Sequence, residues 1–191
     1  MNLPIVHRID ADDRIVYVNE AWTTQAALDG AAPVVREAVL GRVLWDSIAD
    51  FATREIYQRM VAAVRAGRPA HFHYRCDTPE YLRVFEMKIE AMDGELVSFT
   101  SRLVRREHRP PIALLDRHQP RDERFVCMCS WCQRLAAPEG DWINIEQAVE
   151  RLALLQGATS PAITHGICPA CRDEMLRGLG IAERTAPRSE R

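Results

Sequence analysis

Three stretches decide the fold: AHFHYRC at residues 70–76, YLRVFEMKIEA at 81–91 and ELVSFTSRLVR at 95–105. In the first of them, Phe72, Tyr74 and Cys76 alternate with polar side chains, and the other two alternate in the same way. Successive side chains on a strand point to opposite faces of the sheet, so a period of two predicts strands with one buried face. Three such strands in succession indicate an antiparallel sheet.

Further strands and a helix are predicted on the N-terminal side of these stretches. Residues 5–9 and 14–19 are β-favouring runs separated by a polar turn at 10–13, which predicts a hairpin. Residues 51–66 form a helical pattern, with Asp50 as its N-cap and an apolar face that includes Ile56 and Met60. The expected fold class is therefore α+β, with a five-stranded antiparallel sheet and flanking helices.

Two local stretches carry a family resemblance. Residues 14–22, RIVYVNEAW, look like the second strand and first helix of a PAS domain, and residues 41–48, GRVLWDSI, are similar to the segment before its longest helix. With the order of elements, the resemblance covers residues 3–106 and indicates a PAS-like sensor domain at 1–107. It implies a signal-sensing module, and many PAS domains hold a ligand between the sheet and the helices.

The resemblance implies a ligand pocket, which eight side chains are candidates to line. They are Trp22, Trp45, Phe72, Tyr74, Cys76, Phe85, Met87 and Phe99. The Asn-Cys-Arg motif of flavin-binding members is absent, and haem is not expected because His71 and His73 fall on the polar face of their strand. Cys76 is expected to be a small buried hydrophobe, with a redox role as the alternative. The identity of any small ligand stays open.

Paired cysteines are the strongest chemical signal in the second half of the chain. Cys129 and Cys132 form one C-x-x-C pair, and Cys168 and Cys171 form another. Each such turn presents two thiolates to one ion, and structural zinc takes four. We expect these four cysteines to bind zinc, with Cys127 or His165 as alternates for one ligand. Thioredoxin-like redox chemistry is the weaker interpretation, because that chemistry needs only one pair.

The rest of this half is predicted to be a small helical zinc-knuckle module at residues 125–180. Asn144 begins an amphipathic pattern that ends before Gly157, and Pro169 suits the first turn of a second helix. The sequence motif CSWC, followed by THGICPAC, resembles a cysteine-rich tail found after PAS or receiver modules in bacterial signalling proteins. Residues 181–191 are expected to be a disordered tail.

A charged, proline-containing stretch at 108–124 separates the two halves and is expected to be a linker. It contains the apolar run Ile112 to Leu115, which is either a clip packed on one module or an exposed docking segment. Packing is the favoured interpretation.

Composition and missing motifs argue against several classes of function. The 191 residues have a formal net charge of −2 and only scattered arginine clusters, so nucleic acid is not an expected partner. No apolar run is long enough for a membrane span and no signal peptide is present, so the expected location is cytoplasmic. The motifs of zinc proteases, P-loop proteins, kinases and α/β-hydrolases are also missing.

These observations favour a non-enzymatic signal-sensing protein. Its PAS module would perceive a small ligand, a redox state or a partner, and the zinc module would relay that state to another signalling protein by direct contact. The alternative is a zinc-finger transcriptional regulator that binds nucleic acid. A homodimer paired through the outer face of the sheet, where His71, His73 and Arg75 are expected, is a further prediction.

Overall fold

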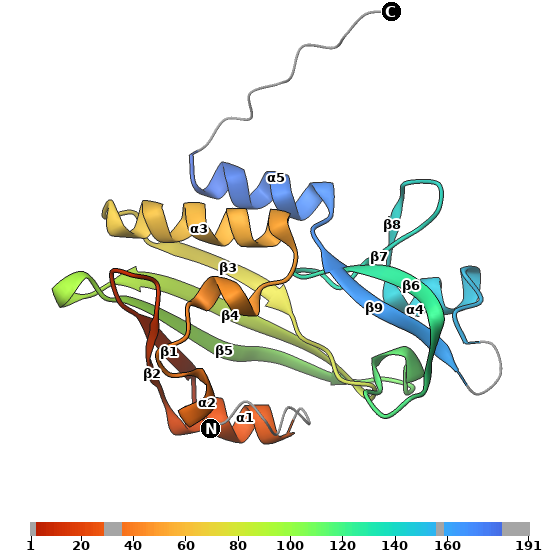
Figure 1. Ribbon diagram of the computed structural model, residues 1–191. Coiled ribbons are helices and arrows are strands. Elements are labelled where there is room, and N and C mark those ends of the chain that lie inside the picture. Colours follow the sequence, from red (N-terminus) through yellow and green to blue (C-terminus); the bar gives the residue numbers. More distant parts are fainter. Residues whose placement is uncertain (1–2, 29–35, 156–158, 181–191) are drawn as a thin grey trace, which may run out of the picture.

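The computed structural model describes residues 3–28, 36–155 and 159–180. A five-stranded antiparallel sheet forms the N-terminal half, with the strand order β2-β1-β5-β4-β3 (Figure 1). Its strands are β1 (Ile5–Ile9), β2 (Ile15–Val18), β3 (Ala70–Arg75), β4 (Tyr81–Ala91) and β5 (Val97–His108). A short 3-10 turn, η2 (Asp93–Glu95), joins β4 to β5. The predicted five-stranded sheet and the α+β fold class are confirmed.

The β1–β2 hairpin follows from its polar turn. One carboxylate oxygen of Asp10 accepts hydrogen bonds from the backbone N–H groups of Asp12, at 3.0 Å, and Arg14, at 2.9 Å. This Asx-type turn reverses the chain before β2 begins. The hairpin predicted from residues 5–19 is therefore confirmed.

Helices cover the buried face of the sheet. They are α1 (Glu20–Leu28), α2 (Arg36–Val39), the 3-10 turn η1 (Leu44–Ser47) and α3 (Phe51–Arg65). The Asp50 carboxylate accepts a 2.7 Å hydrogen bond from the Thr53 N–H, which confirms the predicted N-cap of α3. Ile56, Met60 and Val64 of α3 are buried in the core.

The C-terminal half contains a second sheet, which the sequence pattern did not predict. It has four strands in the order β8-β7-β6-β9, and β6 runs parallel to β9. The strands are β6 (Arg121–Cys129), β7 (Leu135–Ala136), β8 (Trp142–Ile143) and β9 (Ser160–Gly166). Strands β7 and β8 are too short to show a periodic pattern, and β6 and β9 do not alternate regularly between exposed and buried residues. The predicted small helical module is therefore incomplete, because it also contains this sheet.

Two helices complete the C-terminal half, α4 (Ile145–Arg151) and α5 (Pro169–Gly178). Pro169 occupies the first turn of α5, as expected. Helix α4 is shorter than the predicted helix, because Leu152 is its C-cap and Ala153 has a positive φ of 45°. Gly157 and the tail at 181–191 lie outside the described residues.

The predicted linker is packed against the second sheet. Strand β5 continues to His108, and the 3-10 turn η3 (Ala113–Leu115) precedes β6. Ile112 and Leu114 are buried with Val126 and Met128 in the core of the second sheet. The apolar run is therefore a packed clip, which confirms the favoured interpretation.

The two halves share the larger of two hydrophobic clusters. Helix α5 runs beside α3 above the first sheet (Figure 1), and Met175 and Leu179 pack in the same buried cluster as Met60. No helix in the described part of the chain has both the length and the apolarity that a membrane crossing requires.

Candidate metal centre

Four cysteine thiols converge where the second sheet meets α5. The Sγ atoms of Cys129, Cys132, Cys168 and Cys171 all lie within 4.8 Å of one another. The Sγ atoms of Cys132 and Cys168 are 3.7 Å apart. Four sulfurs arranged tetrahedrally at about 2.3 Å from a zinc ion would be separated by about 3.8 Å. The cluster therefore has the dimensions of a tetrahedral thiolate site.

The first C-x-x-C turn is a tight hairpin at the end of β6. The Cys129 N–H donates to the Arg134 carbonyl at 2.8 Å, and the Gln133 N–H donates back to the Cys129 carbonyl at 3.0 Å. Gln133 adopts a φ of 56°, which is the left-handed conformation that closes such a turn. This geometry brings Cys132 back beside Cys129.

The second C-x-x-C turn is the N-terminus of α5. Cys168 is the N-cap residue, and its sulfur accepts a 3.4 Å hydrogen bond from the Cys171 N–H. The Cys168 N–H in turn donates to the sulfur of Cys129 at 3.4 Å. The Ser130 N–H donates to the Gly166 carbonyl at 2.8 Å and so joins the two turns. Backbone N–H groups and the helix N-terminus both favour negative charge on these sulfurs.

Proton sharing among the thiols limits how much negative charge the cluster holds alone. Hydrogen bonds from Cys132 and Cys171 lower the pKa of Cys129 far below that of an ordinary thiol. The hydrogen bond to Cys129 raises the pKa of Cys132, and those to Cys129 and Cys132 raise the pKa of Cys171. These opposite shifts disfavour simultaneous ionisation of Cys129, Cys132 and Cys171, and a bound cation would favour it.

The alternate ligands are not part of this cluster. Cys127 is half-buried on β6, where burial raises the pKa of its thiol, and its sulfur lies close to Gly166. His165 is exposed on β9. Among the described residues, the only group of three or more suitable side chains gathered within ligand distance is the set of four cysteines.

Trp131, between the two cysteines of the first pair, ties the cluster to the N-terminal half. Its side chain is 2% exposed and stacks on Tyr57 of α3, with ring centroids 5.1 Å apart. The Phe72 ring of β3 is 6.2 Å away. The Trp131 carbonyl also accepts a 2.6 Å hydrogen bond from the Arg75 N–H. The metal-binding turn is therefore packed directly into the core beneath α3.

A buried ionic cluster makes a second connection between the halves. The Asp77 side chain is fully buried and pairs with the guanidinium groups of Arg75 and Arg109. Both arginines also reach Glu146 of α4, at 3.4 Å and 2.7 Å. The Asp77 N–H donates to the Gln133 side-chain oxygen at 3.0 Å. Sequence reasoning missed this cluster, because its members are dispersed along the chain and share no motif.

The structure places the eight pocket candidates in the main core and beside two hollows. Six of them pack in or against the main core, namely Trp22, Trp45, Phe72, Tyr74, Met87 and Phe99. Phe85 lines a hollow of about 320 Å³ beneath α1, together with Ser101 and Leu103. This hollow therefore lies between α1 and the first sheet, where the PAS resemblance implies a ligand.

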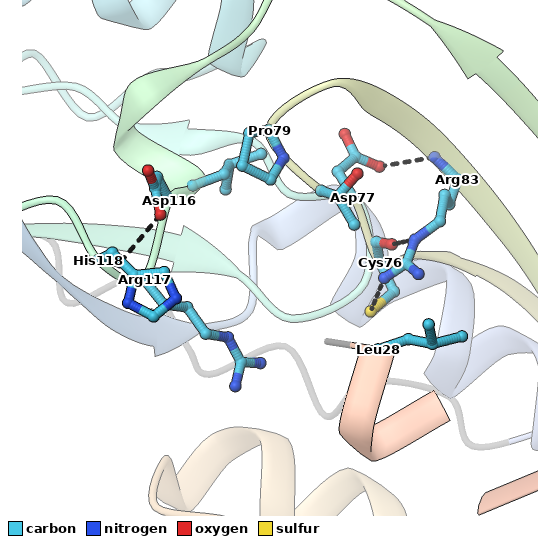
Figure 2. A pocket seen from close by; sticks show the side chains of 10 residues that line it. Leu28, Cys76, Asp77, Pro79, Arg83, Asp116, Arg117 and His118 are labelled. Carbon is cyan, nitrogen blue, oxygen red and sulfur yellow. Dashed lines mark hydrogen bonds between the residues drawn. The ribbon is translucent and has the colours of Figure 1, made fainter. Parts of the chain in front are cut away.

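Cys76 lines a different hollow, of about 260 Å³, between the β3–β4 loop and the segment after η3. Figure 2 shows Arg83 turned toward Cys76, with one guanidinium nitrogen 3.5 Å from the sulfur. Another guanidinium nitrogen of Arg83 donates to the Cys76 carbonyl at 2.5 Å. His118 and Arg117 lie across the hollow. Cys76 is therefore half-buried at the edge of this hollow instead of deep in the core.

Comparisons with known proteins find similarity to solved structures over about half of this chain. No protein-family model matches the chain, and no curated protein matches it. A domain of an HTR-like protein from Haloarcula marismortui is 15% identical, with a TM-score of 0.37, and the match covers 53% of this chain and 98% of that one. A sensory box sensor histidine kinase from Vibrio cholerae is 12% identical, with a TM-score of 0.37, and the match covers 53% of this chain and 82% of that one.

Proposed function

We propose that this protein is a non-enzymatic signalling protein, in which a PAS-like domain receives a signal and a zinc-stabilised module passes it to a partner protein. The strand order β2-β1-β5-β4-β3 and the PAS-like segments at 14–22 and 41–48 support the first part. The observation that carries the proposal is the burial of Trp131 against Tyr57. Through this contact, a displacement of α3 changes the packing of the metal-binding turn.

The zinc ion in this proposal is structural. Cys129, Cys132, Cys168 and Cys171 would fill all four positions of a tetrahedral site and leave none for water or substrate. The ion would hold the two turns together, and the side chains around them would transmit the change. A thiolate-only site supports a non-enzymatic role for the centre.

The placement of α5 supports a protein partner over nucleic acid. Met175 of α5 is buried against the N-terminal half, so this helix is not free to enter a DNA groove. The side chains at 172–174 and 177 carry both signs of charge, which is a poor match for a phosphate backbone.

Hydrogen exchange tests the coupling between the two halves. We expect removal of zinc with a chelator to increase exchange in residues 125–135 and in α3, while the β1–β2 hairpin stays protected. If α3 keeps its protection after the zinc is gone, the proposed relay through Trp131 is wrong.

Mass spectrometry tests the nature of the signal. The mass of the natively purified chain, compared with its denatured mass, shows whether a small molecule is retained. A retained molecule whose removal changes exchange at 105–125 makes the protein a ligand sensor. A native mass that exceeds the denatured mass only by the bound zinc makes the input a redox change or a protein contact instead. Light scattering on the same sample tests the predicted homodimer, which requires twice the chain mass of 21.7 kDa.

A further inference from the structure

Two histidines stand side by side on the open edge strand of the first sheet. His71 and His73 are exposed, lie two residues apart on the same face of β3, and have ring centroids 5.8 Å apart. Strand β3 is the last strand of the sheet, and no other strand of the described residues pairs with its outer edge. Neutral imidazole is a common protein ligand for zinc, copper and nickel ions.

Carboxylates lie next to this pair. The Nε2 atom of His71 is 2.8 Å from the Oε1 atom of Glu86 on β4, and Glu86 is the cross-strand neighbour of His73. The hydrogen bond from His71 lowers the pKa of Glu86, so this side chain is ionised at neutral pH. Both histidines also line a hollow of about 440 Å³ that contains Glu174 of α5.

We propose that His71, His73 and Glu86, after rotation of their side chains, form a second metal site, which binds a divalent transition-metal ion reversibly. Two imidazoles and a carboxylate are the donor set of the facial metal sites of proteins, which leave positions open for exchange. Nothing in this site overlaps with the four cysteines, so the two centres fill independently. The inference goes beyond the proposed structural zinc site.

The geometry makes this site weaker than the thiolate centre. The two imidazole planes are inclined by 56°, so His73 must rotate and the His71–Glu86 hydrogen bond must open before both rings face one ion. These side chains are exposed, so the rotation meets little resistance. Lys88 is paired with His71 and Arg102 with Glu86 across the sheet, and both cations oppose a metal ion. The result is an exchangeable site on the outer surface.

A nickel titration of the full chain, with its zinc content measured first, tests this inference. We expect calorimetry to detect one nickel ion per chain, without the absorption that nickel–thiolate bonds produce. His71→Ala and His73→Ala should each weaken nickel binding by about tenfold or more, and Glu86→Gln by a smaller factor.

The matched control is His118→Ala, because His118 is also exposed but has no histidine two residues away. Nickel affinity should be unchanged in this variant. The inference is overturned if no saturable binding occurs below about 100 µM nickel. It is also overturned if His73→Ala leaves affinity unchanged, or if His118→Ala weakens it equally. The zinc content of these variants reports on the cysteine centre alone, so failure at one site is distinguishable from failure at the other.

Discussion

The two sheets of this protein are stabilised in different ways. The first has long strands, up to β5 with 12 residues, and a core of alternating apolar side chains closed by α3. The second has two strands of only two residues each and a small core of its own. The second sheet therefore depends on contacts from outside it, namely the cysteine cluster and the packing of Trp131 and α5 on the first half.

This difference shows how a small module can be held in a fixed position on a larger one. A small core provides little free energy of folding, and the proposed zinc ion would supply part of it. The turn that contains Cys129 and Cys132 also contains Trp131, which packs on Tyr57. Metal binding, which would fold this turn, would therefore also position Trp131 for docking on the first half. The following predictions test this dependence, from the largest expected effect to the smallest.

Loss of one metal ligand should have the largest effect. We expect Cys129→Ser to remove stoichiometric zinc and to cost about 5 kcal/mol or more in the free energy of unfolding of the second half. Elemental analysis and hydrogen exchange of residues 125–180 measure both effects. Cys76→Ser is the control and should leave the zinc content unchanged. Full zinc content in Cys129→Ser would contradict the four-cysteine site.

Truncation of Trp131 should separate docking from metal binding. Trp131→Ala removes a buried ring and should cost about 3–5 kcal/mol in the free energy of unfolding, measured with urea. Zinc should still be present, because all four cysteines remain. In Trp131→Phe most of the stacking on Tyr57 remains, and the lost indole N–H has no hydrogen-bond partner among the described residues. Equal losses in the two variants would show that ring packing is not what docks the module.

Loss of the ionic cluster at Asp77 should have the next largest effect on stability. Asp77→Ala leaves the guanidinium groups of Arg75 and Arg109 without their buried counterion, and we expect a loss of about 3 kcal/mol in the free energy of unfolding. Thermal unfolding measures this loss. Glu107→Ala, which removes an exposed partner of Arg105, should leave stability unchanged. A similar result for both variants would mean that the buried cluster is not needed for docking.

The N-terminal half should show a pH dependence from His7. This ring stacks on Phe99, and burial lowers the pKa of His7 to about 4. The unfolded chain takes up this proton near pH 6.5 and the folded chain does not, so stability falls as the pH drops between 6.5 and 4. We expect this residue alone to cost about 2 kcal/mol between about pH 7 and pH 5.

Urea unfolding at both pH values measures the effect of His7. His7→Phe should flatten the pH dependence relative to the unchanged chain, because phenylalanine does not titrate. His73→Ala, at an exposed histidine, should leave the pH dependence as it was. An unchanged slope in His7→Phe would show that this imidazole is not held neutral in the folded state.

The smallest effect is expected at Gly166, where β9 passes the side chain of Cys127. A Cβ atom on Gly166 would lie 2.9 Å from the Cys127 sulfur, which is too close for an ordinary contact. We expect Gly166→Ala to cost about 1 kcal/mol in the free energy of unfolding. The double variant with Cys127→Ala should recover this loss. Without recovery, the role of Gly166 lies elsewhere.

Sequence periodicity determined much of the N-terminal half. Five strands, the polar turn at Asp10 and the capping carboxylate of Asp50 are local features, and local chemistry specifies them. The four cysteines were also identified from spacing, because two short turns bring each pair together whatever the surrounding fold.

Only the tertiary structure decided how the two halves join. Tyr57 and Trp131 are far apart in the sequence, as are Arg75 and Glu146, and no local pattern relates the members of either pair. The second sheet could not be predicted from the sequence either. Strands β7 and β8 are too short to show a period of two, and β9 pairs with β6 in parallel although the two strands are separated in the sequence. Such contacts depend on which surfaces remain uncovered after each half has folded, and that is a property of the whole chain in space.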